Sequence, residues 1–473
     1  MKKQEQKLGI WLLVFVAIGS MMGAGIFNAP KDLINVSNPA AAIITWAIGG
    51  GGALVLALVF IYLNARKPEL TSGIFSYARE GFGDYMGFNS AWGYWCVSWM
   101  GNVSYFILFF KTLNDLLGSY ALSPLACFVA ASLMLWVYYF IIRAGIREGA
   151  MLNLVVNIAK LVPLALVIIL GVALIDRHVF AVPDWTSRLA STGASTSLPI
   201  QIKQAMTLVL WCFIGVEAAS VLSGRAKSQK TVRQATILSL LFVLGVYILV
   251  TFIAMSVVPA AELGASDTPL ALLLSKTAIG KAGAVVVQLG ILISIIGASL
   301  SWILLSVETM YAAAKHGVLP RFMAKENNNQ TPVNALLITQ ILTQVFLLAI
   351  LLPEMNNTYV MAITIGTTMV LIPYLLSTLY AVKVSLEKSR RFQVGHFLLA
   401  ALGVVYSMYV IYAVGVRYLF SSFIFYAVGA FVFYCAKREQ KSPIKRWEWV
   451  IIMLLVGTSI VFARFLALGK VVL

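Results

Sequence analysis

Long apolar segments dominate this chain and restrict it to a membrane. Stretches of about 20 residues with few charges recur along almost its whole length, and each can cross roughly 30 Å of hydrocarbon as a helix. Of the 473 residues, 60% are hydrophobic and only 11% are charged, which is unlike the composition of water-soluble globular proteins. We therefore predict an all-α polytopic membrane protein, with residues 1–473 forming a single membrane domain.

The hydropathy pattern predicts twelve or thirteen transmembrane helices. The predicted spans are residues 9–34, 39–65, 84–118, 122–143, 150–176, 199–223, 231–259, 277–315, 331–353, 356–384, 393–415, 416–436 and 446–468. The last span carries Arg464 near its outer end. The total is thirteen if this segment spans the membrane and twelve if it does not. The polar stretches 176–197 and 260–281 are expected to hold short helices.

The first ten spans divide into two sets of five. We expect one repeat over residues 9–176, a second over residues 199–384, and additional C-terminal helices over residues 393–468. Because each set holds an odd number of spans, the two sets have opposite topology, which is typical of an inverted repeat.

The distribution of basic residues predicts the orientation of the chain. A net charge of +17 in a soluble protein would suggest a nucleic-acid partner. Here most Lys and Arg residues lie in the loops on the side of the N-terminus, and such loops are usually cytoplasmic. We predict a cytoplasmic N-terminus, a bacterial plasma membrane location and no nucleic-acid partner. The first span lacks a cleavage site of small residues, so we interpret it as a retained helix.

A glycine-rich break interrupts the first span. Ser20, Met21, Gly23, Ala24 and Gly25 lie at its centre. Glycine lets the backbone leave helical geometry, and unwound backbone inside a bilayer is tolerated where it lines a cavity. The N–H groups at the start of the following half-helix favour a carboxylate. Close helix packing through small residues is the alternative explanation.

A second break lies in the first span of the second set. It contains Trp211, Ile214 and Glu217 in an apolar run. Two breaks at matching places predict a substrate site near the membrane midplane. A carboxylate inside a membrane usually faces a cavity or a partner, so Glu217 is a candidate proton switch or amine ligand. A hydrogen-bonded brace is the alternative. Trp211 offers a ring face to an aliphatic or cationic group.

Lys160 is the other costly residue inside a span. Asn153, Asn157 and Lys160 follow i, i+4 and i+7, so they share one helix face. A fixed ammonium there can stand in for a sodium ion and brace the first break, or it can carry a coupled proton. Structural pairing with a backbone carbonyl is the alternative.

Three further positions complete the candidate set. Asn102 lies deep in the third span and is suited to hydrogen-bond a substrate's distal group. Trp302 lies beside small residues in the eighth span and is a candidate to close the pocket. Gly366 lies among threonines in the tenth span. No Ser/His/Asp or His/Glu ligand arrangement occurs inside the spans, so we expect neither an enzyme nor a metal or other cofactor.

These motifs resemble the amino acid–polyamine–organocation superfamily, and within it the basic amino acid/polyamine antiporter family. The resemblance covers at least residues 9–385. The segments that carry it are Gly23 to Phe27, Pro68 to Gly83, Tyr94 to Asn102, Trp211 to Glu217, Trp302, Thr331 to Val333, and Pro373 with Tyr374. It implies the leucine-transporter fold, a 5+5 inverted repeat with discontinuous helices 1 and 6.

The resemblance also implies roles for individual residues. The break from Gly23 to Gly25 would hold the α-carboxylate and amine of an amino acid. The distal group would lie near Val97 and Asn102, and Trp211 would stack on the aliphatic stem. The residues implied in coupling or gating are Tyr94, Lys160, Glu217, Trp302 and Tyr374.

Two residues depart from the arginine/agmatine exchangers of this family. Ala24 stands where those exchangers have serine, which removes one hydrogen bond to a carboxylate. Lys160 is absent from that subgroup but present in arginine/ornithine-like and proton-coupled relatives.

The expected function is exchange of an external amino acid for a related internal amino acid or its decarboxylated amine by alternating access. A cationic substrate (arginine, ornithine, lysine or histidine) is implied by the family. A proton-coupled symporter is the nearest alternative, and a sensor without flux or a membrane enzyme is the alternative from another class. Besides these substrates we expect membrane lipid as a partner, and both a monomer and a homodimer remain open.

Overall fold

In the part of the chain that it describes, the computed structural model consists of helices joined by connecting segments. That part comprises residues 7–23, 25–180, 189, 194–266, 268–351, 355–387 and 393–468. Eleven helical segments within it are long and apolar enough to cross a membrane. The prediction of an all-α polytopic membrane protein is therefore confirmed.

The helices follow the predicted spans closely. In chain order they are α1 Ile10–Met21, α2 Gly25–Val36, α3 Pro39–Arg66, α4 Ile74–Phe82, α5 Asp84–Leu117, η1 Gly118–Tyr120, α6 Pro124–Ala144, α7 Ile146–Val172, α8 Arg177–Phe180, α9 Leu198–Phe213, α10 Ala218–Val221, η2 Ser223–Arg225, α11 Gln229–Val257, α12 Ala260–Ala265, α13 Pro269–Ser275, α14 Gly280–Lys315, η3 Arg321–Ala324, α15 Val333–Phe346, η4 Leu347–Leu351, α16 Met355–Ser385, α17 Val394–Val414, α18 Val416–Glu439 and α19 Arg446–Ala467. The short helices α8, α12 and α13 lie in the two polar stretches where they are expected.

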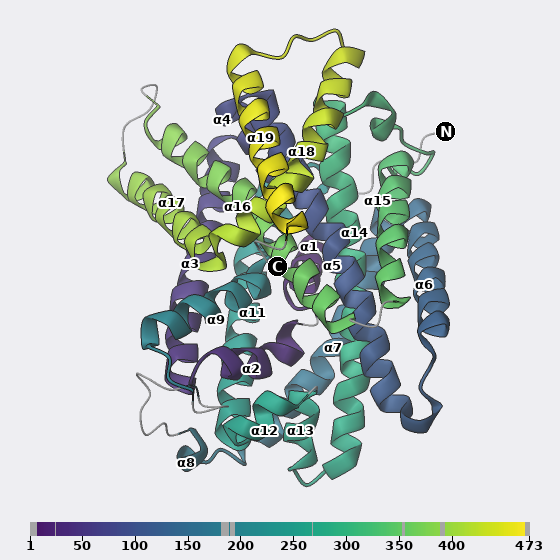
Figure 1. Ribbon diagram of the computed structural model, residues 1–473, viewed down its shortest axis with the longest axis vertical. Coiled ribbons are helices and arrows are strands. Elements are labelled where there is room, and N and C mark those ends of the chain that lie inside the picture. Colours follow the sequence, from purple (N-terminus) through teal and green to yellow (C-terminus); the bar gives the residue numbers. More distant parts are fainter. Residues whose placement is uncertain are drawn as a thin grey trace.

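The broken first span lies at the centre of the molecule, and the C-terminal helices lie at its edge. α1 packs against α7, α11 and α14, and Figure 1 draws it near the middle of the view, whereas α17 lies at the left edge. In the most apolar part of Ile10–Val36, 71% of the residues are buried, against 17% in Arg446–Ala467. The large exposed apolar side chains of the outer helices are the surface that lipid would cover.

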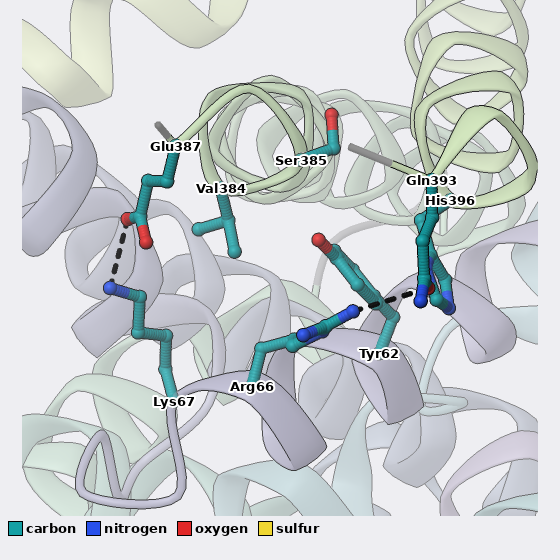
Figure 2. Close-up of a pocket in the computed structure, with 8 residues that line it drawn as sticks. All are labelled: Tyr62, Arg66, Lys67, Val384, Ser385, Glu387, Gln393 and His396. Atoms are coloured by element: carbon teal, nitrogen blue, oxygen red, sulfur yellow. Dashed lines mark hydrogen bonds and ion pairs between the residues drawn. The ribbon is translucent and has the colours of Figure 1, made fainter. Parts of the chain in front are cut away.

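The ends of α3, α16 and α17 are tied together by polar contacts at the face where α1 begins, which we call the N-terminal face. Figure 2 shows the small pocket that they surround. Arg66 donates to Gln393 Oε1 at 3.3 Å, and Lys67 pairs with Glu387 at 2.9 Å. The Tyr62 and His396 rings stack with their centroids 4.7 Å apart. These contacts fix the loop-proximal ends of three helices.

Small residues let the inner helices approach closely. Gly93 of α5 lies against α16 and α18: a Cβ built on it would lie 2.7 Å from Met369 O and would also clash with Tyr426. Tyr426 itself donates to Met369 O at 3.0 Å. Glycine is therefore required at this crossing for steric reasons, as in other close helix pairs in membranes.

Substituting Gly93 with alanine is expected to destabilise the protein by about 1–3 kcal/mol, the usual cost of overpacking a tight interior. Gly51→Ala in α3 is the matched control, because a Cβ there meets no atom within 4 Å. The measurement is thermal unfolding in detergent. A melting temperature for Gly93→Ala equal to that of Gly51→Ala would contradict the close packing at α5.

Candidate functional site

The first break separates α1 from α2, and its carbonyl groups are bonded by side chains of other helices. Met21 O accepts from Tyr247 Oη at 3.1 Å. Met22 O accepts from Lys160 Nζ at 2.7 Å and from Ser294 Oγ at 3.1 Å. The acceptors freed by unwinding are therefore paired, while the N–H groups that begin α2 have no partner within their own helix. Ala24 lies outside the described residues.

A glycine is needed on the side of this break that faces α5. A Cβ on Gly23 would lie 2.8 Å from Tyr105 Cζ, well inside van der Waals contact. The Gly23 carbonyl also accepts from Ser294 Oγ at 3.2 Å. The backbone at the break is thus held between α5 and α14.

Lys160 is fully buried on α7 and points at the first break. Its ammonium donates to Met22 O, and within the described residues it pairs with no carboxylate. Asn153 and Asn157 lie on the same face: Asn153 donates to Ser301 Oγ at 2.7 Å, and Asn157 donates to Phe15 O at 3.2 Å. The shared face predicted from the i, i+4, i+7 spacing therefore packs against α1 and α14.

The second break lies between α9 and α10 and touches the first. Gly215 has a φ of +110°, a conformation that favours glycine. Its carbonyl accepts from Ser20 Oγ at 3.3 Å. A Cβ at Gly215 would lie 3.1 Å from the Ser20 backbone. The two interrupted helices therefore cross with backbone against backbone. Ile214 directly precedes this glycine and is buried.

Glu217 is fully buried at the second break and is bonded on one oxygen only. Glu217 Oε2 accepts from Tyr374 Oη at 2.5 Å and from the Gly215 N–H at 3.2 Å. Glu217 Oε1 has no hydrogen-bond partner among the described residues, nor has the hydroxyl of Tyr94 beside it. The carboxylate thus links the second break to α16, with a further hydroxyl on α5 in reach of a small movement.

Trp302 braces the first break. Its indole N–H donates to Ser20 O at 3.1 Å, and its ring lies 5.7 Å from that of Tyr94, centroid to centroid. The side chain is only 3% exposed. In this conformation Trp302 is part of the wall behind the break.

Trp211 and Asn102 lie where the breaks meet α5. A Cβ on Gly25 would lie 3.6 Å from Trp211 Cδ1, and one on Gly101 would lie 3.6 Å from Trp211 Cη2, so the indole extends from the start of α2 to α5. Asn102 is fully buried, and neither polar atom of its amide has a hydrogen-bond partner among the described residues. Such an amide is costly unless a ligand satisfies it.

Val97 and Gly366 complete the group predicted from the sequence. A Cβ on Gly366 of α16 would lie 3.4 Å from Val97 Cγ2 of α5, and both residues are buried. The structure thus brings Val97, Asn102, Trp211 and Gly366 together along α5, α9 and α16. Lys160 and Trp302 approach the first break from α7 and α14.

A cavity of about 260 Å³ leads away from the breaks. It is lined by Gly25, Ala29, Asp32, Leu33, Asn35, Val36, Trp46, Thr207, Leu208, Val209, Trp211, Cys212, Ile363 and Thr364. Asn35 at its far end is exposed, whereas Trp46 and Cys212 are buried. The cavity therefore runs from the first break toward the face opposite the N-terminus.

Sequence reasoning missed Asp32, Tyr247 and Ser294. Tyr247 and Ser294 act on the first break from helices far away in sequence, and no local pattern marks them. Asp32 had a signal: it is a carboxylate inside an apolar segment, seven residues after Gly25, with Lys31 next to it.

A match to a known family shows to which family this chain belongs. The family described as amino acid permease matches residues 8–417. The chain belongs to the amino acid permease family. An arginine/ornithine antiporter of Pseudomonas aeruginosa is 38% identical over 453 residues, covering 94% of this chain and 93% of that one. A putative arginine/ornithine antiporter of Escherichia coli K12 is 35% identical over 469 residues, covering 96% and 98%.

One further relative agrees with this family, and one solved structure agrees with the fold. An arginine/ornithine antiporter of Latilactobacillus sakei is 33% identical over 479 residues, covering 100% of this chain and 99% of that one. A substrate-bound, outward-open sialic acid symporter coupled to Na⁺ has a TM-score of 0.58 at 13% identity, covering 87% and 90%. The resemblance to the amino acid–polyamine–organocation superfamily and the leucine-transporter fold are thereby confirmed, and this permease is a multi-pass membrane protein.

The N-terminal face of this permease is closed where the two broken helices reach it. Leu8 N donates to Arg225 O at 2.7 Å, and Lys227 N donates to Leu8 O at 3.0 Å. Arg225 pairs with Glu308 at 3.2 Å and with Glu326 at 3.5 Å. Burial alone would lower the pKa of Arg225, but these carboxylates more than offset it and raise the pKa. The charged guanidinium therefore stays in place across the closure.

Glu308→Gln is expected to loosen this closure, because Arg225 loses its main counter-charge in a buried place. We expect amide hydrogen exchange at Leu8 and Lys227 to accelerate about tenfold or more, which corresponds to about 1.4 kcal/mol. Glu262→Gln is the control, since it removes an exposed pair with Lys276 on the opposite face. Equal exchange rates in both variants would show that Arg225 and Glu308 do not hold the closure.

Proposed function

We propose that this permease is an amino acid antiporter that exchanges an external cationic amino acid for an internal related amino acid or its decarboxylated amine. Arginine and ornithine are the first pair to test, because relatives that share 33–38% identity over nearly the whole chain carry the name arginine/ornithine antiporter. The observation that carries the proposal is the contact of two interrupted helices at Ser20 and Gly215 beside a cavity.

The substrate's α-carboxylate binds the N–H groups at the start of α2 in this proposal. These groups lack partners within the helix and lie at its positive end. The amine of the substrate binds backbone carbonyls of the breaks near Ser20, Met21 and Ile214. Each carbonyl oxygen has two lone pairs, so Ser20 O and Met21 O can accept the amine beside their bonds from Trp302 and Tyr247. Unwound backbone at membrane depth provides both kinds of group within a few ångströms, which an unbroken helix does not.

The rest of the substrate extends toward α5. The Asn102 amide receives the distal group, because both its polar atoms are buried and unbonded within the described structure. Trp211 stacks on the aliphatic stem, and Val97 with Gly366 forms the adjoining wall. Tyr94, Glu217 and Tyr374 couple this pocket to the movement of the second break.

Alternating access moves the two broken helices relative to the rest of the bundle. We propose that residues 9–176 and 199–384 are the two repeats of opposite topology, with residues 393–468 added outside them. The closure at Arg225 is then the cytoplasmic gate, because the loops beside it hold most of the basic residues. The membrane is then a bacterial plasma membrane, with the N-terminus inside.

A proton-coupled symporter is the second candidate, and Lys160 favours it. A buried ammonium whose observed bond is to a carbonyl can lose its proton and leave the break with one bond fewer. In that case Lys160 would release the substrate when it gives up a proton.

Counterflow in proteoliposomes tests the antiporter. We expect labelled arginine to enter vesicles preloaded with ornithine and to enter empty vesicles far more slowly. Each partner (ornithine, lysine, histidine, agmatine or none) is loaded separately. Equal uptake into empty vesicles that rises with an acid-outside gradient would overturn exchange and support the symporter.

Lys160→Met is expected to reduce exchange by about tenfold or more, because a hydrogen bond from a charged group contributes about 1.5–3 kcal/mol. Ser294→Ala is the neutral control: it removes the hydroxyl that donates to Met22 O and Gly23 O without removing a charge, and we expect it to retain more activity than Lys160→Met. The measurement is the initial rate of arginine–ornithine exchange over a range of pH. An unchanged rate for Lys160→Met at every pH would refute the role of Lys160.

A further inference from the structure

Asp32 brings a carboxylate into the cavity that leads to the breaks. It lies on α2, seven residues after Gly25, and is half-buried in the cavity wall with Thr207, Trp211 and Thr364. It is the one acidic side chain among the residues that line this cavity. The cavity runs on to Asn35, whose amide donates to Gly264 O at 2.9 Å and so joins the mouth to α12.

Asp32 has no bonded partner among the described residues, unlike the carboxylates of Glu217 and Glu308. Glu217 accepts from Tyr374, and Glu308 pairs with Arg225. Asp32 forms neither a hydrogen bond nor an ion pair with any residue in the described part of the chain. The charge that acts on it comes from Lys31, its neighbour in sequence, which does not line the cavity.

The surroundings of Asp32 suit an organic cation. Trp46 and Trp211 both contribute to the cavity wall, and aromatic faces attract guanidinium and ammonium groups. The threonine hydroxyl groups at 207 and 364 can accept additional hydrogen bonds. A carboxylate in a mostly apolar hollow attracts a cation more strongly than one in open water, because the local dielectric constant is lower.

We propose that Asp32 forms an entry subsite that binds the cationic side-chain group of the substrate in the access cavity. The inference rests on the proposed function and adds to it the residue that selects cationic amino acids. The substrate meets Asp32 first, and its cationic group passes to Asn102 once the α-carboxylate is bound at the break.

The length of the substrate agrees with this position. Seven residues of helix place Asp32 about 10 Å along α2 from Gly25. An extended arginine has about 7 Å between its carboxylate and guanidinium carbons by ordinary bond lengths. A hydrogen bond of about 2.9 Å at each end covers the remaining distance between Gly25 and Asp32. An arginine can therefore keep its guanidinium on Asp32 while its carboxylate reaches the start of α2.

The test compares arginine with citrulline, which has the same length but carries no side-chain charge. Binding to the purified, full-length protein in nanodiscs is measured by calorimetry, and KM and kcat are measured by exchange in proteoliposomes. Asp32→Asn is expected to weaken arginine binding and raise its KM by about tenfold or more, because one charge pair is lost. Citrulline binding and the kcat for arginine are expected to stay unchanged.

Two variants separate this role from general effects. Asp32→Glu keeps the charge and is expected to retain the preference for arginine. This variant still tests the inference if Asp32→Asn does not fold. Asp176→Asn removes a carboxylate outside the cavity, directly before α8, and is expected to change the affinity for neither substrate. An unchanged ratio of arginine to citrulline affinity in Asp32→Asn would overturn the inference, as would an equal loss for both substrates.

The two proposals can fail separately. Arginine binding that depends on Asp32, without any exchange in the wild-type protein, would refute the antiporter and keep the subsite. Arginine–ornithine exchange whose arginine-to-citrulline ratio does not depend on Asp32 would keep the antiporter and refute the subsite.

Discussion

The structure depends on how the backbone groups of an unwound helix find hydrogen-bond partners inside a membrane. Backbone groups that leave the helix pattern have no water to bond to in the hydrocarbon. Here Lys160, Tyr247 and Ser294, from three different helices, donate to the carbonyls of Met21, Met22 and Gly23. Each of these carbonyls thus has a partner in the protein, whereas the N–H groups that begin α2 lack one within their own helix, and Gly25 at that end lines the cavity. The polarity of the site follows from this division.

The second break is held in a complementary way. Gly215 offers its carbonyl to Ser20 and its N–H to Glu217, so much of the polar backbone there bonds within the pair of broken helices. Tyr374 on α16 then holds Glu217 from outside the pair. In the described part of the chain, Gly215 and Glu217 therefore bond mainly within the pair, with Tyr374 as the partner from outside it. The arrangement suits an element that changes position, because few polar groups lose their partners when it moves.

The sequence predicted the long helices well, although eleven helical segments among the described residues are apolar enough to span, against the twelve or thirteen predicted. It marked only part of the candidate site. Spans are set by length and apolar character, and Lys160 and Glu217 stood out because charges inside a span are costly. Tyr247 and Ser294 could not be found, because a lone hydroxyl in an apolar helix has no spacing that reveals its distant partner. Trp302 was expected to close the pocket, and its indole N–H donates to Ser20 O. This contact depends on how far α1 and α14 are shifted along each other, which the sequence does not reveal.

The closure and the cavity lie at opposite ends of the same broken helices. Leu8, before α1, bonds to Arg225, after α10, whereas α2 and α9 line the cavity at the other end. This contact therefore joins the start of the first broken helix to the end of the second at the N-terminal face, away from the end of the pair that lines the cavity. Because Ser20 and Gly215 join the two helices between these ends, the pair can tilt as one unit against the rest of the bundle in the proposed mechanism, and a tilt that opens one end then closes the other. Access from the two sides then alternates as a consequence of where the helices are broken.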